Sequence, residues 1–323
     1  MHEVARIIWN SNAGSSSVQE SVASRLSEMA GVRVIETAGR DEAIRTTRQA
    51  IRDSVPRIIA AGGDGTVNAV ATAFMQEGAG ESAFGVIPLG TGNDLARSLG
   101  MPLNPLDSLV QALEGRIHLI DVVAAEQPGH PRWIFNMVTA GNSGRFADRV
   151  TSELKEKWGV LAYLRAGVEA LQDLTVYDVT LQADGAAPMT VRALNVFIAN
   201  GRTSGGGLRV APAACLTDGL LDYIVVLEGT GGALTTLAAD YAFDRLLENE
   251  LILAGRARSL RVTACPALEF SGDGDVIDSA PTSFAVCDGA LPAVTGPGAA
   301  IDFPKHRQDS GSIIPPVSLT GVI

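Results

Sequence analysis

The sequence predicts an α/β domain with a parallel sheet, followed by a second domain that is mostly β. Three observations support this prediction. The chain has 323 residues, of which 46% are hydrophobic, so two domains with buried cores are expected rather than one. The first third alternates strand-like and helical patterns, and from residue 120 onward the period changes to that of successive strands.

The first third of the chain contains short apolar runs that alternate with amphipathic stretches. The expected strands are residues 5–8, 32–35, 57–60 and 84–88. The expected helices are residues 15–29, 41–51 and 65–75. A strand followed by a helix, repeated several times, indicates a parallel sheet. Glycine-rich breaks fall between strands and helices, where the ligands of open α/β sheets bind.

The remainder of the chain reads as strands separated by turn residues. The expected strands are residues 120–124, 133–138, 177–182, 191–199, 219–227, 259–263, 268–270, 284–287 and 291–294. Two helices with amphipathic spacing are expected to interrupt them, at residues 145–171 and 234–249.

Charge and composition exclude several classes of protein. A net charge of -11 argues against nucleic acid as the main partner, because phosphate backbones require a basic field. No apolar run approaches the roughly 20 residues of a spanning helix, and the chain enters a strand at once, so a cytoplasmic protein is expected. Membrane contact would need a local basic patch. The candidates are Lys155, Lys157, Arg165, Arg256, Arg258 and Arg261, for which a solvated charged face is the more ordinary explanation.

The first chemical motif is Gly62-Gly63-Asp64-Gly65-Thr66, which joins a buried strand directly to a helix. A helix N-terminus preceded by glycines presents unpaired N–H groups and a positive dipole end to a phosphate. Asp64 would suit a network of Mg²⁺ and water beside that phosphate. The alternative is a tight turn in which Asp64 caps the helix.

The second motif is Gly90-Thr91-Gly92-Asn93-Asp94, at the head of another helix. Neither motif is a Walker A loop, because no Gly-Lys-Ser/Thr follows. Two such loops at adjacent strand ends could hold one nucleotide between them.

The pair GGDGT and PLGTGNDLAR resembles the hallmark motifs of the diacylglycerol kinase catalytic-domain family, which includes bacterial lipid kinases, sphingosine kinases and ceramide kinases. The resemblance extends to Asn10, in the segment where the family has Asn-Pro-x-x-Gly, and to GGGLRVAPAACLTDGLLDYIVV. It covers roughly residues 4–297. We expect chance agreement of these spaced motifs to be very rare.

The resemblance implies the architecture and the reaction. Residues 1–121, completed by residues 296–323, would form the nucleotide-binding domain, and residues 122–295 a β-sandwich domain that contributes acceptor and metal sites. The reaction would be transfer of the γ-phosphoryl group of ATP to the hydroxyl of diacylglycerol or a related lipid, with Mg²⁺. The lipid would be met at a membrane surface by peripheral association. The resemblance leaves open whether the chain forms a homodimer.

Individual residues carry over from the family motifs. Asp64, Asp94 and Asp121 match acidic positions of a magnesium and water network near the phosphates. Asp218 matches a second metal position, with the backbone carbonyls of Cys215 and Leu220 as further ligands. A helix cap, a strand end and an Asp-Gly turn are the respective alternatives for Asp94, Asp121 and Asp218.

The departure from the family is at Asp273-Gly274-Asp275, where the family has Asp-Gly-Glu with the glutamate as general base. Asp275 is shorter by one methylene, about 1.5 Å of reach. A misplacement of about 1 Å can cost on the order of 100-fold in rate. Either the site has contracted around Asp275, or activity is reduced or redirected, with Asp273 and Asp278 as possible substitutes.

Two other functions therefore remain open. One is a kinase of the same fold that acts on a specialised or soluble alcohol, including NAD, since NAD kinases share the Gly-Gly-Asp-Gly motif. The other is a catalytically weakened protein that binds nucleotide or lipid. The motif GTGNDLAR belongs to the lipid branch and argues against NAD.

Overall fold

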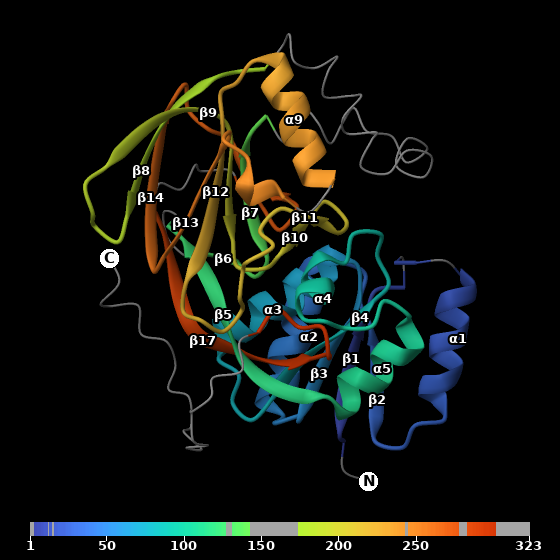
Figure 1. Cartoon of the computed structure of the whole chain (residues 1–323). Helices are drawn as coiled ribbons and strands as arrows, with labels where there is room; N and C mark the ends of the chain where they lie inside the picture. Colours follow the sequence, from blue (N-terminus) through green and yellow to red (C-terminus); the bar gives the residue numbers. More distant parts are fainter. Residues whose placement is uncertain are drawn as a thin grey trace.

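The computed structural model describes residues 3–11, 13–14, 16–126, 131–142, 174–242, 245–277 and 283–301. Within them the chain forms an α/β part and a β-rich part, drawn in the lower and upper halves of Figure 1. The predicted helix at residues 145–171, the residues Lys155, Lys157, Arg165 and Asp278, and the tail from residue 302 lie outside this description.

The α/β part is a parallel sheet with strand order β4, β3, β1, β2. These strands are β1 (Ala5–Trp9), β2 (Val32–Glu36), β3 (Arg57–Gly62) and β4 (Ala83–Pro88). Its helices are α1 (Ser16–Ser27), α2 (Arg40–Arg52), α3 (Asp64–Glu77), α4 (Asp94–Ser98) and α5 (Pro105–Glu114). The inner strands are buried along almost their whole length because both of their faces are covered.

The β-rich part is antiparallel. Its strands are β6 (Arg132–Ile134), β7 (Met137–Gly141), β8 (Tyr177–Ala183), β9 (Met189–Ala199), β10 (Thr203–Ser204), β11 (Leu208–Arg209), β12 (Leu221–Leu227), β13 (Ile252–Ala257), β14 (Ser259–Cys265), β15 (Phe270–Gly272) and β16 (Asp275–Val276). Helix α9 (Gly231–Ala242) and the 3₁₀ turn η2 (Leu246–Glu248) lie between β12 and β13.

Two long strands belong to both parts. These are β5 (Arg116–Ala125) and β17 (Ser283–Thr295), which pair with each other along most of their length. Near its end β17 also pairs in parallel with β4, with Ala293 opposite Phe84. Figure 1 shows both strands passing from the upper part to the lower. The division at residue 121 and the role of residues 296–323 stay predictions.

Several predicted elements differ in the structure, among them the expected strand 268–270, which shares only Phe270 with β15. The expected strand 133–138 is split into β6 and β7, whereas the expected strands 284–287 and 291–294 are one strand with a register shift. Gly289, with φ 58°, lies inside that shift. The expected helix 234–249 begins at Gly231 and ends at Ala242, and β13 was not predicted. Asp240, in the helix, accepts hydrogen bonds from the side chains of Arg245 and Asn249.

Separate apolar cores support the two parts. One large core contains residues of β1, β3, α3, β4 and the last residues of β17, and the other contains residues of β7, β9, β12 and β14. Within the described residues, no helix has the length and apolar character needed to cross a membrane.

Candidate functional site

The glycine-rich turn between β3 and α3 is the centre of the candidate site. Strand β3 ends at Gly62 and α3 begins at Asp64, so the amides of Asp64 and Gly65 have no partner within the helix, whereas the amide of Thr66 donates to the carbonyl of Gly63. A Cβ on Gly62 would lie 2.6 Å from the Thr66 side chain, which explains why this position is a glycine. The turn therefore presents N–H donors at the carboxyl end of a central strand.

The second glycine-rich loop packs directly on the first. A Cβ on Gly90 would lie 2.5 Å from the Cα of Gly63. Both carboxylate oxygens of Asp64 accept backbone N–H bonds across the contact, from Asn93 and Asp94, each at 2.9 Å. Asn93 itself is left-handed, with φ 55°. The structure thus brings the two predicted motifs together, with Asp64 as the bridge between them.

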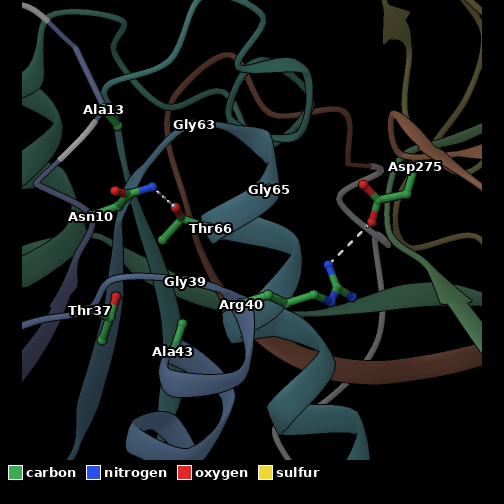
Figure 2. Close-up of a pocket in the computed structure, with 10 residues that line it drawn as sticks. All are labelled: Asn10, Ala13, Thr37, Gly39, Arg40, Ala43, Gly63, Gly65, Thr66 and Asp275. Carbon is green, nitrogen blue, oxygen red and sulfur yellow. Dashed lines mark hydrogen bonds and ion pairs between the residues drawn. The ribbon is translucent and has the colours of Figure 1, made fainter.

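A hollow of about 360 Å³ opens beside the first loop, and we call it the nucleotide hollow (Figure 2). Its lining consists of Asn10, Ala13, Thr37, Gly39, Arg40, Ala43, Gly63, Gly65, Thr66 and Asp275. Asn10 donates from Nδ2 to Oγ1 of Thr66 at 3.1 Å. A Cβ on Gly65 would meet no protein atom within 4 Å, so no protein contact requires a glycine there.

A second hollow, of about 380 Å³, also borders this turn, and we call it the acceptor hollow. Asp64, Asp94 and Asp273 contribute carboxylates to its lining. Its apolar lining comes from both parts of the molecule and comprises Val67, Leu95, Phe135 and Met137. The N-terminus of α3 supplies residues to both hollows, with Gly63, Gly65 and Thr66 in the first and Asp64 and Val67 in the second.

Asp94 connects the two parts of the molecule. Its carboxylate accepts N–H bonds from Gly206 at 3.0 Å and Gly207 at 2.9 Å. Both glycines have positive φ, 89° and 104°, in the turn between β10 and β11. This turn therefore closes over the Gly90–Asp94 loop.

Asp273 is enclosed by hydrogen-bond donors. Its carboxylate accepts the amides of Phe135, Asn136 and Met137 at 2.8 to 3.0 Å, and Nδ2 of Asn68 at 3.2 Å. These bonds divide β6 from β7, which explains the split of the predicted strand. Burial raises the pKa of Asp273, while the hydrogen bonds from the backbone amides act in the opposite direction.

Asp275 is half-exposed and carries two ion pairs on one oxygen. Its Oδ2 lies 2.9 Å from Nη2 of Arg132 and 3.3 Å from Nη1 of Arg40. Among the described residues, no hydrogen bond reaches the other oxygen, Oδ1. Asp275 therefore keeps an oxygen that could accept a proton, at the wall of the nucleotide hollow (Figure 2).

Asp121 lies apart from Asp64 and Asp94. Its side chain is fully buried and accepts the amides of Gly219 at 2.8 Å and Gly289 at 2.7 Å. Burial raises the pKa of Asp121 to about 6, and the neighbouring Asp288 also raises it. The residue lines neither hollow, so the structure does not bring it into the predicted group of three carboxylates.

Asp218 is paired with a cation of the chain itself. Its Oδ1 accepts the amide of Leu220 at 3.1 Å, and its Oδ2 lies 3.5 Å from Nη1 of Arg256. Cys215 is buried in the same loop. Because the guanidinium of Arg256 already lies beside the carboxylate of Asp218, this arrangement of oxygen ligands fits a metal ion poorly. The metal site at Cys215, Asp218 and Leu220 stays a prediction.

Asp64 and Asp94 fit a magnesium ion better. Oδ2 of Asp64 lies 2.6 Å, and Oδ2 of Asp94 3.7 Å, from a Cβ built on Gly92, so the two carboxylates converge. Among the described residues, no cluster of three or more His, Cys, Asp or Glu is placed to hold a metal. Mg²⁺ commonly takes one or two carboxylates and completes its shell with substrate phosphates and water.

The sequence did not point to several residues of the site. Arg40 and Arg132 had no motif to mark them, since an arginine at a helix start or strand end is ordinary. Asn68, one turn after Asp64, was accessible in principle, because it lies on the same face of α3. Thr91 and Gly92 of the second motif, by contrast, were predicted to hold the nucleotide, and they line the acceptor hollow instead.

Comparisons with known proteins agree with this architecture. The model of the diacylglycerol kinase catalytic domain matches residues 4–125. The model of the YegS C-terminal NAD kinase beta sandwich-like domain matches residues 136–295. Together the two models span both parts of the molecule, including both glycine-rich loops and the Asp273–Asp275 turn.

Relatives match over nearly the whole chain. A "Probable lipid kinase YegS-like" of Pseudomonas aeruginosa is 29% identical over 310 residues, 95% of this chain and 99% of its own. Another of that name, from Pectobacterium atrosepticum, is 32% identical over 83% of this chain and 88% of its own. A crystal structure of a diacylglycerol kinase from Bacillus anthracis shares the fold, with a TM-score of 0.70 at 20% identity over 92% of this chain and 98% of that one. The chain therefore belongs to the diacylglycerol kinase catalytic-domain family of phosphotransferases, among its YegS-like lipid kinases.

Proposed function

We propose that the protein transfers the γ-phosphoryl group of ATP to the hydroxyl of diacylglycerol or a related lipid alcohol. One observation carries the proposal, namely that the N-terminus of α3 supplies residues to both hollows. A nucleotide in the first hollow and an alcohol in the second would meet at this helix end. Phosphoryl transfer depends on such positioning and on charge stabilisation more than on covalent chemistry by the protein.

The nucleotide is held by the first glycine-rich turn, whose Gly63, Gly65 and Thr66 line the nucleotide hollow. The free amides of α3 donate to the phosphates, and the dipole of the helix favours their charge. Gly65 faces open space, which leaves room for a phosphate against the backbone. Asn10 and Thr66, which bind each other, form the adjoining wall.

Asp275 acts as the general base in this proposal. Asp275 lines the nucleotide hollow and its neighbour Gly274 lines the acceptor hollow, so we place the acceptor hydroxyl where the two hollows meet. There the free oxygen, Oδ1, accepts the proton of the hydroxyl as the hydroxyl oxygen bonds to the γ-phosphorus. The bond from that phosphorus to the oxygen bridging to the β-phosphate then breaks, and ADP leaves. Asp273, whose oxygens are already occupied by four donors, holds the β6–β7 turn in place rather than taking the proton.

Asp64 and Asp94 would hold Mg²⁺ in the acceptor hollow. The ion would neutralise charge on the phosphoryl group where it meets the acceptor hydroxyl. Each oxygen of Asp64 accepts one backbone N–H and retains a further lone pair for an ion or its water. In Asp94, Oδ1 accepts the amides of both Gly206 and Gly207, so Oδ2 is the oxygen that retains a lone pair.

The apolar lining of the acceptor hollow favours a lipid over a soluble alcohol. Val67, Leu95, Phe135 and Met137 would pack on the hydrocarbon next to the hydroxyl. A substrate of this kind resides in a bilayer, and we therefore propose peripheral membrane association. Arg258 and Arg261, at the start of β14, are candidates for contact with anionic headgroups.

The test is an acceptor panel with γ-labelled ATP and Mg²⁺. Diacylglycerol and other long-chain alcohols in mixed vesicles form one arm, and NAD and glycerol form the other. For the parent chain, we expect labelled product with a lipid and no labelled product with NAD. For Asp64→Ala, whose fold is verified by thermal melting, we expect no labelled product with any acceptor. Labelled NAD would favour the soluble-alcohol reading. Tight ATP binding without product on any acceptor would favour a binding protein.

A further inference from the structure

Arg40 is the first residue of α2, and its side chain crosses from the α/β part to Asp275 of the β-rich part (Figure 2). One guanidinium nitrogen, Nη1, lies 3.3 Å from Oδ2 of Asp275, and the other, Nη2, donates to Oδ1 of Asn68 at 2.8 Å. The side chain is 39% exposed, so a ligand in the hollow can reach it.

The same side chain lines the nucleotide hollow together with the residues proposed to bind phosphate. Gly63, Gly65 and Thr66 of the α3 turn share this lining with Arg40 and Asp275. Guanidinium groups recognise phosphate through parallel N–H donors in a planar fork. Among the described residues, the Nε of Arg40 makes no hydrogen bond, so donor capacity remains for a ligand.

A purely structural role explains Arg40 less well, because both of its partners are held by other residues. Asp275 has Arg132 at 2.9 Å, which comes from its own half of the molecule. Asn68 donates to Asp273 at 3.2 Å, and its Oδ1 also accepts from Thr72 at 3.4 Å. Removing Arg40 would therefore leave both side chains in place.

We propose that Arg40 binds the terminal phosphate of a nucleoside triphosphate and sets its position relative to the carboxylate of Asp275. This inference rests on the proposed function, since it takes Asp275 as the group that faces the acceptor hydroxyl. The phosphate nearest Asp275 is then the one transferred, which ADP lacks. Arg40 consequently distinguishes ATP from ADP and aligns phosphate with base.

The experiment measures binding of ATP and ADP by calorimetry, and turnover of the best lipid acceptor, for the full chain and three variants. Arg40→Gln removes the charge, and Arg40→Lys keeps it without the fork. Arg52→Gln is the matched control, because Arg52 lies on the same helix and also forms an ion pair with another element, Glu77 of α3, at 2.7 Å. Thermal melting verifies that each variant is folded.

We expect Arg40→Gln to weaken ATP binding by at least about tenfold, as loss of a charge-assisted hydrogen bond implies, and ADP binding by less than about twofold. At saturating ATP its kcat stays below that of the parent chain, because the alignment with Asp275 is lost. The ATP affinity and kcat of Arg40→Lys should lie between those of Arg40→Gln and the parent chain. Those of Arg52→Gln should equal the parent values.

Two results would overturn the inference and separate it from the proposed function. In the first, the parent chain phosphorylates lipid, but Arg40→Gln weakens the binding of ATP and of ADP equally or leaves both unchanged. The role given to Arg40 is then wrong and the proposed function stands. If the parent chain does not bind ATP, both are wrong.

Discussion

Asp275 is the residue at which the chain departs from its family and at which its chemistry is most directly testable. Asp275→Asn keeps the shape but cannot accept the hydroxyl proton, so we expect a loss of about 100-fold or more in kcat. Asp178→Asn, an exposed aspartate of β8, is the matched control and should retain parent activity. Initial rates at saturating ATP and lipid provide the measurement, and a parent-like rate for Asp275→Asn would falsify its role as the base.

Asp275→Glu tests whether the site has contracted. Because Asp275 is half-exposed and borders an open hollow, the longer side chain has room, and we expect activity at least equal to that of the parent. A loss of activity approaching 100-fold would instead show that the site has contracted around the shorter carboxylate and has no room for a glutamate.

Asp121 predicts a pH dependence of stability in metal-free protein. Its folded-state pKa is raised to about 6, above its ordinary value, so its protonated form is the one that folding favours. Its stabilising contribution is complete below about pH 4 and is lost as the pH rises through about 6, with a slope of at most about 1.4 kcal/mol per pH unit.

The measurement is urea unfolding in EDTA from pH 4 to 7.5, for the parent chain and Asp121→Asn. We expect the stability of the parent to fall relative to that of the variant as the pH rises through this interval. Parallel profiles would mean that Asp121 has the same pKa in the folded and unfolded chain.

At the scale of elements, Gly65 and Gly90, one in each glycine-rich loop, are expected to serve different purposes, the first ATP binding and the second the fold. Gly65 borders open space, so Gly65→Ala should fold normally, since alanine also suits a helix better than glycine. Its methyl group would enter the nucleotide hollow and weaken ATP binding. Gly90→Ala would place a Cβ 2.5 Å from the Cα of Gly63, and we expect a loss of about 1–3 kcal/mol in stability.

Thermal melting and ATP calorimetry on both variants give the comparison. The expected pattern is an unchanged Tm with weak ATP binding for Gly65→Ala, and a lowered Tm for Gly90→Ala. A lowered Tm for Gly65→Ala, with ATP affinity retained, would show that this glycine serves the fold.

The sequence predicted elements well where local signals decide them and poorly where distant contacts do. The alternation of strands and helices in the first third, and both glycine-rich loops, depend on local periodicity and turn chemistry. The break between β6 and β7 depends on Asp273, which lies more than 130 residues away along the chain. Arg40 and Arg132 converge on Asp275 only after the sheet has formed, so no local pattern could reveal them.

At the scale of the whole molecule, β5 and β17 make the two parts mechanically dependent. The two strands pair from Arg116 opposite Thr295 to Ala125 opposite Phe284, and thus cross between the two apolar cores. Asp94 adds a second connection through Gly206 and Gly207. We therefore expect one cooperative unfolding transition rather than two. Calorimetry measures this directly, and two resolved transitions with separate enthalpies would contradict it.

The pairing of β17 with β4 has a consequence for how the protein is made. The sheet of the first part is extended beyond β4 only by the end of β17, where Ala293 lies opposite Phe84. Leu291 and Ala293 also fill the core of that first part. Although domains near the start of a chain commonly fold while the ribosome is still adding residues, this one cannot finish its sheet until translation has passed residue 295. Until then β4 exposes an unpaired edge, and such an edge can pair with another chain.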